Sequence, residues 1–405
     1  MGQNRISPTY RLYTSGVDLS RRSAVKTLGA AAAAALLEGC ARRVFPGTTA
    51  RAPEPLHLPR VDIRTELEIR TVVGLRPFRP SGFVVRAEKI GDKLVVHNYG
   101  HGGGGVTLSW GTSELAARIV DAQEVQPAKP TEQAYSNAAR RIAVLGAGAV
   151  GLASGRLLQE RGYHVTIYAR DLPPKTTSNI AGAQWYPFLV YESEHATAAF
   201  LKQYVEAARI ANRRFQLMAG DRYGVHWTPN YYCSSQPYTT GRFGPDNPLH
   251  EFLIDVTAIE GATNPFPLPY VRRVQTIMIE PSIYLSEVMN DFLIAGGKIV
   301  VTEVHTIADL TTLNESTIVN CTGLGAHTLF ADNELIPVKG QLTVLLPQPA
   351  VNYAALFGDY YMFPRHDGIL LGGTHERDVW TLEPNLEAKQ RVLAEHQKFF
   401  SAMKT

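Results

Sequence analysis

The sequence predicts an α/β fold built around a Rossmann-like nucleotide-binding unit, accompanied by at least one further domain. Two observations support this prediction. A strand, a glycine-rich turn, a helix and a second strand follow one another over residues 141–168, and 45% of the 405 residues are hydrophobic while only 19% are charged. This composition excludes a disordered chain. At about 150 residues per domain, the length predicts two or three domains with large buried cores.

Charge and cysteine content exclude two further classes of protein. The chain has 40 basic and 37 acidic residues, a net charge of +3, without the clustered basic excess of nucleic-acid-binding proteins. We therefore expect no nucleic-acid partner. The three cysteines are too few for a disulfide scaffold.

Residues 1–40 predict an export signal rather than a folded element. Arg21 and Arg22 lie in a basic segment, and the apolar stretch Thr27–Leu37 after them is shorter than the roughly 20 residues that span a bilayer. Paired arginines indicate the twin-arginine route, with the twin-arginine export machinery as a partner. We expect the protein in the periplasm or cell envelope of a bacterium. The alternative is an alanine-rich helix near an unused N-terminus.

The end of this segment resembles a bacterial lipobox, in which the cysteine is lipidated and becomes the first residue. Cys40 is therefore a candidate lipid anchor, and we expect membrane contact only through it. Glu38 departs from the pattern, because small or apolar residues are usual at that place. Residues 41–59, which contain prolines and arginines, predict a tether.

Several elements precede the glycine-rich turn. Residues 83–88 and 94–97 predict two strands around the turn signal at Gly91, and residues 106–120 have the apolar spacing of a helix. Four consecutive glycines, 102–105, lie just before that helix. Such a run predicts a flat backbone surface with free N–H groups, which suits a planar or anionic ligand.

The glycine-rich turn itself predicts a dinucleotide site. The sequence Gly146, Ala147, Gly148, Ala149, Val150 and Gly151 follows an apolar run of strand length and opens a helix. Glycines here permit a tight turn, close approach of the backbone to a pyrophosphate and close helix–strand packing. The helix N-terminus then faces the phosphates.

The acidic residue expected after the second strand is displaced, since Arg170 precedes Asp171 there. Asp171 can reach a ribose hydroxyl, or Arg170 can prefer a phosphate. This motif alone leaves FAD and a nicotinamide cofactor as alternatives.

Several separate blocks resemble the D-amino-acid oxidase family, whose members are FAD flavoproteins, and together they cover about residues 60–120 and 140–405. The blocks at 73–77 (V-G-L-R-P) and 97–103 (H-N-Y-G-H-G-G) are specific, because few other proteins carry both. The remaining blocks are 146–151, 176–185, 319–323, 340–341, 361–364 and 371–374.

These blocks occur in a rotated order. In the family the glycine fingerprint opens the chain and the two specific blocks close it, whereas here the closing blocks come first. No block is duplicated or missing, so the resemblance implies a circular permutation in which residues 121–140 join the old end to the old start. The rival explanation is two truncated copies or a spliced gene model.

The resemblance implies a Rossmann-like FAD-binding domain and a second, mostly antiparallel β domain that binds the substrate. The expected division is 60–120 for the permuted segment, 141–199 for the fingerprint unit, 200–310 for mainly the substrate domain, 311–330 for the return to the FAD domain, and 331–405 for the substrate domain with a terminal helix. We also expect residues 94–96 and the helix from Val106 to pack against the fingerprint unit.

The resemblance also assigns the substrate site. Arg76 aligns with the family's substrate arginine, whose guanidinium fork pairs with a carboxylate in two places. Tyr361 matches the tyrosine that donates to the same carboxylate, and Gly103 matches the glycine whose carbonyl accepts the substrate amine. A second family tyrosine is replaced by Phe357, and Tyr353 or Tyr360 are the candidates to take its place.

The cofactor residues implied by the resemblance surround the FAD from several segments. Beyond the fingerprint, they are Gly102, Gly104, Gly105, Val106, Thr107, Arg170, Asp171, Thr176, Thr177, Ser178, Ala183, Gln184, Trp185, Val304, Thr322 and Gly323. The start of the helix at Val106 would stabilise negative charge on the reduced flavin. No acid–base pair is required, no metal is expected, and no residue is assigned as an acid or base.

The resemblance therefore implies an exported, FAD-dependent oxidative deaminase of D-amino acids. Such an enzyme transfers hydride to the flavin and yields a 2-oxo acid, ammonia and, with molecular oxygen, hydrogen peroxide. One alternative is a related amine, imino-acid or D-aspartate oxidoreductase that passes electrons to a membrane acceptor. Others are an amino-acid-binding flavoprotein without turnover and a nicotinamide-dependent dehydrogenase. The sequence predicts no oligomeric state.

Overall fold

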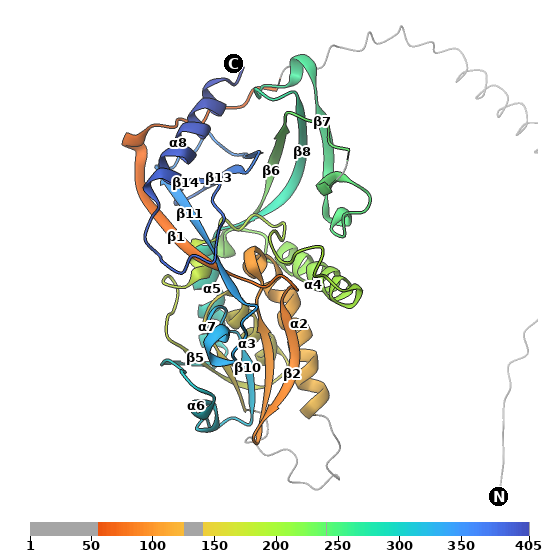
Figure 1. The fold of residues 1–405 in the computed structure, drawn as a ribbon, viewed down its shortest axis with the longest axis vertical. Coiled ribbons are helices and arrows are strands. Elements are labelled where there is room, and N and C mark those ends of the chain that lie inside the picture. The colour runs from red at the N-terminus through yellow and green to blue at the C-terminus, as the bar shows by residue number, and fades with distance from the viewer. Residues whose placement is uncertain (1–55, 125–140, 240, 405) are drawn as a thin grey trace, which may run out of the picture. The chain divides into compact units, whose positions relative to one another are not determined.

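Two β-sheets organise the chain in the computed structural model, which describes residues 56–124, 141–239 and 241–404 (Figure 1). The predicted export signal with Arg21, Arg22 and Cys40, most of the tether and residues 125–140 of the linker lie outside the described residues. No helix in the described ranges has the length and apolar character that a bilayer span requires.

The first sheet is parallel except for one edge strand. Its order is β2-β3-β10-β4-β5-β9, and only β2 runs antiparallel to its neighbour. Its strands are β2 (Val84–Ile90), β3 (Lys93–Tyr99), β4 (Arg141–Leu145), β5 (His164–Ala169), β9 (Lys298–Val301) and β10 (Thr317–Asn320). Strand β4 is buried from its second residue onward, as expected for a strand covered on both faces.

Helices cover this sheet and pack against one another. Helix α2 lies against α3 and α4, while α3 also contacts α5. Their bounds are α2 (Gly105–Glu124), α3 (Ala149–Glu160), α4 (Ala198–Leu217) and α5 (Pro281–Ile294). Two shorter helices, α6 (Ile307–Thr311) and α7 (Gly325–Leu329), flank β10 in the chain. Helix α3 buries Leu152 and Leu158 at helical spacing, which explains why this segment folds as an amphipathic helix.

The structure confirms the predicted strand, turn, helix and strand of the fingerprint as β4, α3 and β5. It also confirms the hairpin of β2 and β3, whose turn contains Gly91 with φ of 60°. Residues that precede the fingerprint join the same sheet, because β10 lies between β3 and β4 with parallel pairing on both sides. The expected packing of residues 94–96 and the Val106 helix is therefore found.

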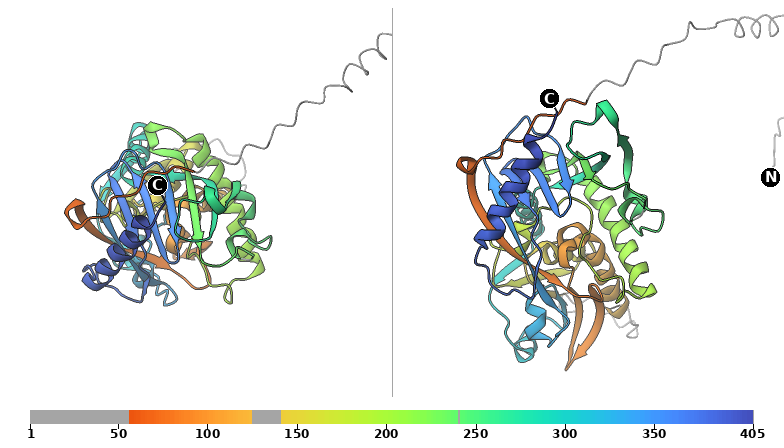
Figure 2. Two further views of the ribbon diagram at one scale, coloured as in Figure 1. Left: turned by 90° about the horizontal axis from the view of Figure 1, so that it is seen from above. Right: turned by 45° about the horizontal axis from the view of Figure 1, so that its top comes forward.

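The second sheet is mostly antiparallel, with the order β1-β11-β14-β13-β12-β6-β8-β7 and β15 added to β11. Only β12 and β6 pair in parallel. Its strands are β1 (Glu68–Phe78), β6 (Val225–Ser234), β7 (Ile254–Ile259), β8 (Tyr270–Ile279), β11 (Ile336–Leu345), β12 (Ala354–Phe357), β13 (Tyr360–Arg365), β14 (Gly368–Gly372) and β15 (Glu376–Arg377). Helix α8 (Leu386–Ser401) packs across β11, β13 and β14 (Figure 2).

Two of the segments named in the expected domain division contribute to both sheets or to their helices. Strand β1, within 60–120, belongs to the antiparallel sheet, where it pairs with β11 along its whole length. Strand β9 and helix α5, within 200–310, belong with the parallel sheet and its helices. The chain therefore returns to the parallel sheet before residue 311, because the crossover from β8 runs through α5 and β9.

Candidate active site

A cavity of about 690 Å³ is lined by residues of both sheets. The turn after β4 and the segment after β10 contribute from the parallel sheet. Strands β1, β11 and β13 contribute from the antiparallel sheet. Of the residues predicted from the sequence to bind substrate or cofactor, all line this cavity except Gly104, Gly151 and Trp185.

At each glycine of the turn after β4, a side chain would interfere with the structure or the cavity in a different way. Gly146 has φ of 96°, and a Cβ there would lie 2.6 Å from the Cys321 carbonyl oxygen. A Cβ on Gly151 would lie 1.9 Å from the Gly146 carbonyl oxygen, so this glycine lets α3 pack on the turn rather than lining the cavity. Gly148 is the N-cap of α3 and faces the cavity. A side chain there would fill the space in front of the helix N-terminus.

The second predicted phosphate segment lies beside this turn. The Ala149 backbone N–H donates to Ser178 Oγ at 3.0 Å, and the Thr176 hydroxyl donates to Asn179 Oδ1 at 2.8 Å. The first bond holds Ser178 against the start of α3, and the second orders the segment itself. A glycine turn, a helix N-terminus and hydroxyl groups at one cavity wall form a donor set that fits a pyrophosphate.

The displaced acidic residue after β5 belongs to a three-membered ion cluster. Arg170 pairs with Asp171 at 2.8 Å and with Glu303 at 3.1 Å, and all three line the cavity. Two carboxylates already balance the guanidinium, so this cluster suits a neutral ribose hydroxyl better than an additional phosphate. Glu303 escaped the sequence prediction, although its neighbour Val304 was included.

The run of four glycines serves packing as well as the cavity. A Cβ on Gly102 would lie 1.9 Å from the Leu189 carbonyl oxygen, and one on Gly103 would lie 2.4 Å from the Phe188 carbonyl oxygen. Gly104 is buried against Val190 and does not line the cavity, whereas Gly105 does. The expectation of a flat ligand-facing surface therefore holds for only part of the run, because residues 188–190 press against it.

The segment 183–185 joins the two sheets. Ala183 adopts φ of 57°, and Gln184 forms a bridge with Met278 of β8. Trp185 is buried, and its indole N–H donates to the Thr107 carbonyl oxygen at 3.1 Å. Trp185 thus supports the first turn of α2 from behind, which explains why it does not line the cavity.

Arg76 enters the cavity from β1. Its guanidinium lies over Gly340 of β11, where a Cβ would come within 2.3 Å of both terminal nitrogens. The side chain donates to the Thr374 carbonyl oxygen at 3.3 Å, and no carboxylate of the described residues lies within ion-pair distance. Most of its five N–H donors therefore remain available to a ligand.

Tyr361 and Tyr360 of β13 both line the cavity. The ring of Tyr361 lies over Gly372, where a Cβ would be 2.5 Å from the tyrosine hydroxyl oxygen. Phe357, at the place of the second family tyrosine, is instead a core residue stacked on Phe399 with centroids 3.8 Å apart. Tyr353 is fully buried and donates to the Pro59 carbonyl oxygen. Tyr360 is thus the one of the two candidates that reaches the cavity.

Three further side chains of the cavity escaped the sequence prediction. His375 lies near Arg76, and its pKa is lowered to about 4 by burial and then by the positive charge of Arg76. Arg242 comes from the connection between β6 and β7, and Asp359 from the turn between β12 and β13. Their segments are loops without periodic pattern, so only the tertiary structure reveals their position.

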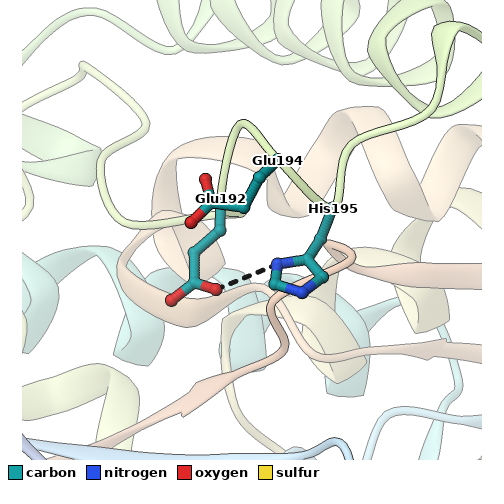
Figure 3. A group of neighbouring side chains, drawn as sticks. All are labelled: Glu192, Glu194 and His195. Atoms are coloured by element: carbon teal, nitrogen blue, oxygen red, sulfur yellow. Dashed lines mark ion pairs between the residues drawn. The ribbon is translucent and has the colours of Figure 1, made fainter.

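A group of potential metal ligands lies on the loop 192–195. Glu192, Glu194 and His195 bring one ligand atom each within 4.8 Å of one another (Figure 3). Glu192 is already engaged by His195 Nδ1 at 3.1 Å and by Arg377. Because these ion pairs account for the cluster, we assign no metal to it.

Several known proteins are similar to this chain in sequence or in structure. Residues 141–405 match the FAD dependent oxidoreductase family. The chain is 29% identical over 258 residues to the D-amino-acid oxidase of Streptomyces coelicolor, covering 62% of this chain and 75% of that protein. It is 29% identical over 265 residues to the D-aspartate oxidase of Homo sapiens, covering 63% and 74%. Glycine oxidase from Geobacillus kaustophilus aligns with a TM-score of 0.49 and 16% identity over 65% of this chain and 80% of that chain.

Fold and cavity together define a dinucleotide-binding protein with a second, mostly antiparallel sheet. The chain belongs to the FAD dependent oxidoreductase family, and it is a flavoprotein oxidoreductase. Family membership implies FAD, one of the two cofactors that the fingerprint left open. The glycine turn, the start of α3 and the hydroxyls of residues 176–178 are the groups that would hold its pyrophosphate.

Proposed function

We propose that this protein oxidises D-amino acids to imino acids, which hydrolyse to 2-oxo acids and ammonia, and that molecular oxygen takes the electrons and becomes hydrogen peroxide. The observation that carries this proposal is the Arg76 guanidinium. It has no carboxylate partner among the described residues, and it shares a cavity with Tyr361 and with the dinucleotide turn. The names of the aligned D-amino-acid oxidase and D-aspartate oxidase support the choice of substrate class.

The residues of this chain would bind and orient the substrate. FAD, when bound, accepts the two electrons and the hydrogen that leave the α-carbon. Arg76 would hold the α-carboxylate through two parallel N–H bonds, and the Tyr361 hydroxyl would donate to the same group. The Gly103 carbonyl would accept from the substrate amine. The first turn of α2, with Thr107 buried beneath Trp185, would place backbone N–H groups where negative charge develops.

The deciding experiment uses the purified, FAD-loaded protein without oxygen. D-alanine should bleach the flavin absorbance, whereas L-alanine should not, because binding alone cannot reduce a flavin. Absence of bleaching by a panel of D-amino acids would refute the proposal. With oxygen restored, consumption of oxygen and formation of peroxide would support an oxidase. Bleaching without oxygen consumption would instead favour the alternative that passes electrons to a membrane acceptor.

We also propose that the chain is a circular permutation of the family's order. The family match begins at residue 141, yet residues 68–124 supply strands to both sheets. The side chain of Arg60 binds the Met403 carbonyl oxygen, so the start and the end of the described chain lie together where the family's order would run on without a break. A rebuilt chain that starts at Arg141 and carries residues 60–124 after residue 404 should fold and bind FAD. An insoluble, flavin-free product would contradict the proposal.

We also propose that the protein is exported through the twin-arginine route, as the paired Arg21 and Arg22 predict. A protein that binds FAD through its completed fold would benefit from crossing the membrane already folded. Replacing Arg21 and Arg22 with lysine should leave active, FAD-loaded protein in the cytoplasm, which cell fractionation would measure. Unchanged export of the double variant would argue against the twin-arginine route. Mass spectrometry of the N-terminus would test lipidation of Cys40.

A further inference from the structure

A second guanidinium that has no carboxylate partner among the described residues faces the same cavity as Arg76. Arg242 lies in a short 3₁₀ turn, Gly241–Phe243, within the connection between β6 and β7. Within the described ranges, no acidic side chain lies within ion-pair distance of it, although Arg209 and Arg273 nearby are both paired. The proposed function does not use Arg242.

Two tyrosine rings fix the orientation of this guanidinium. Its central carbon lies 3.7 Å from the ring centroid of Tyr186 and 4.7 Å from that of Tyr232. A terminal nitrogen donates to the Tyr232 hydroxyl oxygen at 3.0 Å. Stacking on aromatic rings orders an arginine without neutralising its charge, so the remaining N–H groups keep their capacity to bind an anion.

Further hydrogen bonds brace the two rings. Asn247 donates to the Tyr186 hydroxyl oxygen at 3.1 Å and to the Arg242 carbonyl oxygen at 2.6 Å. Gln184, two residues before Tyr186 in the chain, donates to the Tyr232 hydroxyl oxygen at 3.3 Å. The arginine is therefore held by a network that spans three segments: residues 184–186, β6 and residues 242–247. Such a network indicates a prepared position rather than a solvent-exposed side chain in free rotation.

Among the described residues, none of the other charged side chains that line the cavity forms an ion pair with Arg242. Arg170 is balanced by Asp171 and Glu303. Lys175 lies beside Thr176 on the phosphate side, and the charge of Asp359 acts to raise the pKa of His375. Arg76 and Arg242 thus form a pair of cationic forks in one chamber. A partly buried guanidinium without a counterion is costly, so a ligand that supplies the anion binds with a large gain.

We propose that Arg242 binds a carboxylate at the end of the substrate side chain, so that the preferred substrates are acidic D-amino acids. This inference rests on the proposed function, in which Arg76 holds the α-carboxylate. Strand pairing connects the two sites across the antiparallel sheet. Tyr232 of β6 lies opposite Leu356 of β12, and Leu356 lies opposite Tyr361 of β13. Adjacent strands are about 4.8 Å apart, so Tyr232 and Tyr361 originate about 10 Å apart on one face.

The test compares acidic substrates with neutral substrates of matched shape. Kinetics of the FAD-loaded enzyme are measured with D-aspartate, D-glutamate and D-2-aminoadipate, and with D-asparagine, D-glutamine and D-norvaline. The wild-type enzyme should favour the acid over its amide, and the best chain length reports the span between the two arginines. Arg242→Gln should lower kcat/KM for the best acid about 10- to 100-fold and change the neutral substrates less than about 3-fold.

Two further variants distinguish recognition from general damage. Arg242→Lys keeps the charge but lacks the planar fork, so it should recover only part of the preference. Arg209→Gln removes a positive charge that pairs with Glu251 of the same connection but lies outside the cavity, so it should leave the preference unchanged. Equal wild-type rates for acids and amides, or an equal loss of both in Arg242→Gln, would overturn the proposal.

A binding measurement keeps this inference separate from the proposed oxidation. Glutarate and pentanoate have the same number of carbons but two carboxylates and one carboxylate, respectively. Titration of each against the flavin absorbance of the holoenzyme should show tighter binding of glutarate, and Arg242→Gln should abolish the difference. If D-amino acids fail to reduce the flavin while glutarate binding still depends on Arg242, the oxidation proposal fails and the dicarboxylate site stands. If glutarate binds no better than pentanoate, the dicarboxylate site fails.

Discussion

The arginines at the two ends of the cavity differ in their carboxylate partners among the described residues. At the end formed by the segments after β5 and β9, Arg170 is paired with Asp171 and Glu303, and its side chain is 66% exposed. At the end formed by the antiparallel sheet, Arg76 and Arg242 have no carboxylate partner among the described residues. Paired charges leave nothing for an anionic ligand to neutralise. The difference indicates that the first end receives a neutral group, whereas the second receives a carboxylate.

The largest effect is expected from removing the charge of Arg76. Charge-assisted hydrogen bonds are worth about 1.5–3 kcal/mol each, so Arg76→Ala should cost about 2–5 kcal/mol of transition-state binding and lower kcat/KM about 10- to 1000-fold or more. Arg76→Lys should recover part of the loss, because an ammonium cannot reproduce the planar fork. The measurement is steady-state kinetics with a D-amino acid, together with flavin content.

Two controls decide whether the loss comes from the carboxylate contact. The matching amine, which lacks a carboxylate, should be oxidised equally by the wild type and Arg76→Ala. Gly340→Ala places a methyl group within 2.3 Å of the guanidinium nitrogens and should reproduce part of the defect, with no further effect in the Arg76→Ala background. If Arg76→Ala loses its flavin, or loses both substrates equally, Arg76 is structural.

Two glycines of the turn after β4 are expected to have different roles, Gly146 in folding and Gly148 in FAD binding. Gly146→Ala should destabilise the flavin-free protein by about 1–3 kcal/mol, because the residue has positive φ and approaches the Cys321 carbonyl. Gly148→Ala should leave that stability nearly unchanged and weaken FAD binding, since its Cβ would extend toward the cavity near Ser178. Thermal unfolding of apoprotein and flavin titration measure the two effects. Equal behaviour of both variants would contradict this division.

The unbalanced charge of Arg76 should also be detectable through His375. Burial and then Arg76 lower the pKa of this histidine to about 4, below its ordinary value of 6.5. The unfolded chain therefore binds more protons between pH 6.5 and about 4, so stability falls as the pH drops through this window. His375→Gln should reduce that fall by about 2 kcal/mol in urea denaturation compared between pH 7 and pH 4.5. An identical pH dependence in both proteins would refute the assignment.

The elements of the fold that the sequence predicts are those that depend on a local pattern of residues. The fingerprint predicts β4, α3 and β5 because apolar spacing and glycine conformation act within a few residues of the chain. The sequence does not predict which sheet β1 and β9 join, because strand pairing joins residues far apart in sequence and leaves no local periodicity. The contacts of the glycine run 102–105 with residues 188–190 likewise arise only in the tertiary structure, so the sequence does not predict them.

The candidate site follows the same rule. Arg76 and Tyr361 stand in recognisable blocks, and the structure brings both to the cavity wall. Arg242, Asp359 and His375 stand in loops whose course depends on turns and on packing against other segments. A lone arginine in a loop most often forms a surface ion pair, so only the absence of a carboxylate partner within the described part of the chain distinguishes Arg242.

The smallest effect is expected at the paired end of the cavity. Arg170→Gln removes one member of an exposed cluster, and exposed ion pairs contribute about 0–1 kcal/mol, so the free energy of unfolding should change by less than about 1 kcal/mol. The value of kcat/KM should stay within about 2-fold, because a balanced charge offers no attraction that a ligand loses. Urea denaturation and kinetics at low and high salt measure both quantities. A loss comparable with that of Arg76→Ala would show that Arg170 binds an anion despite its two carboxylates, and the contrast between the two ends would then fail.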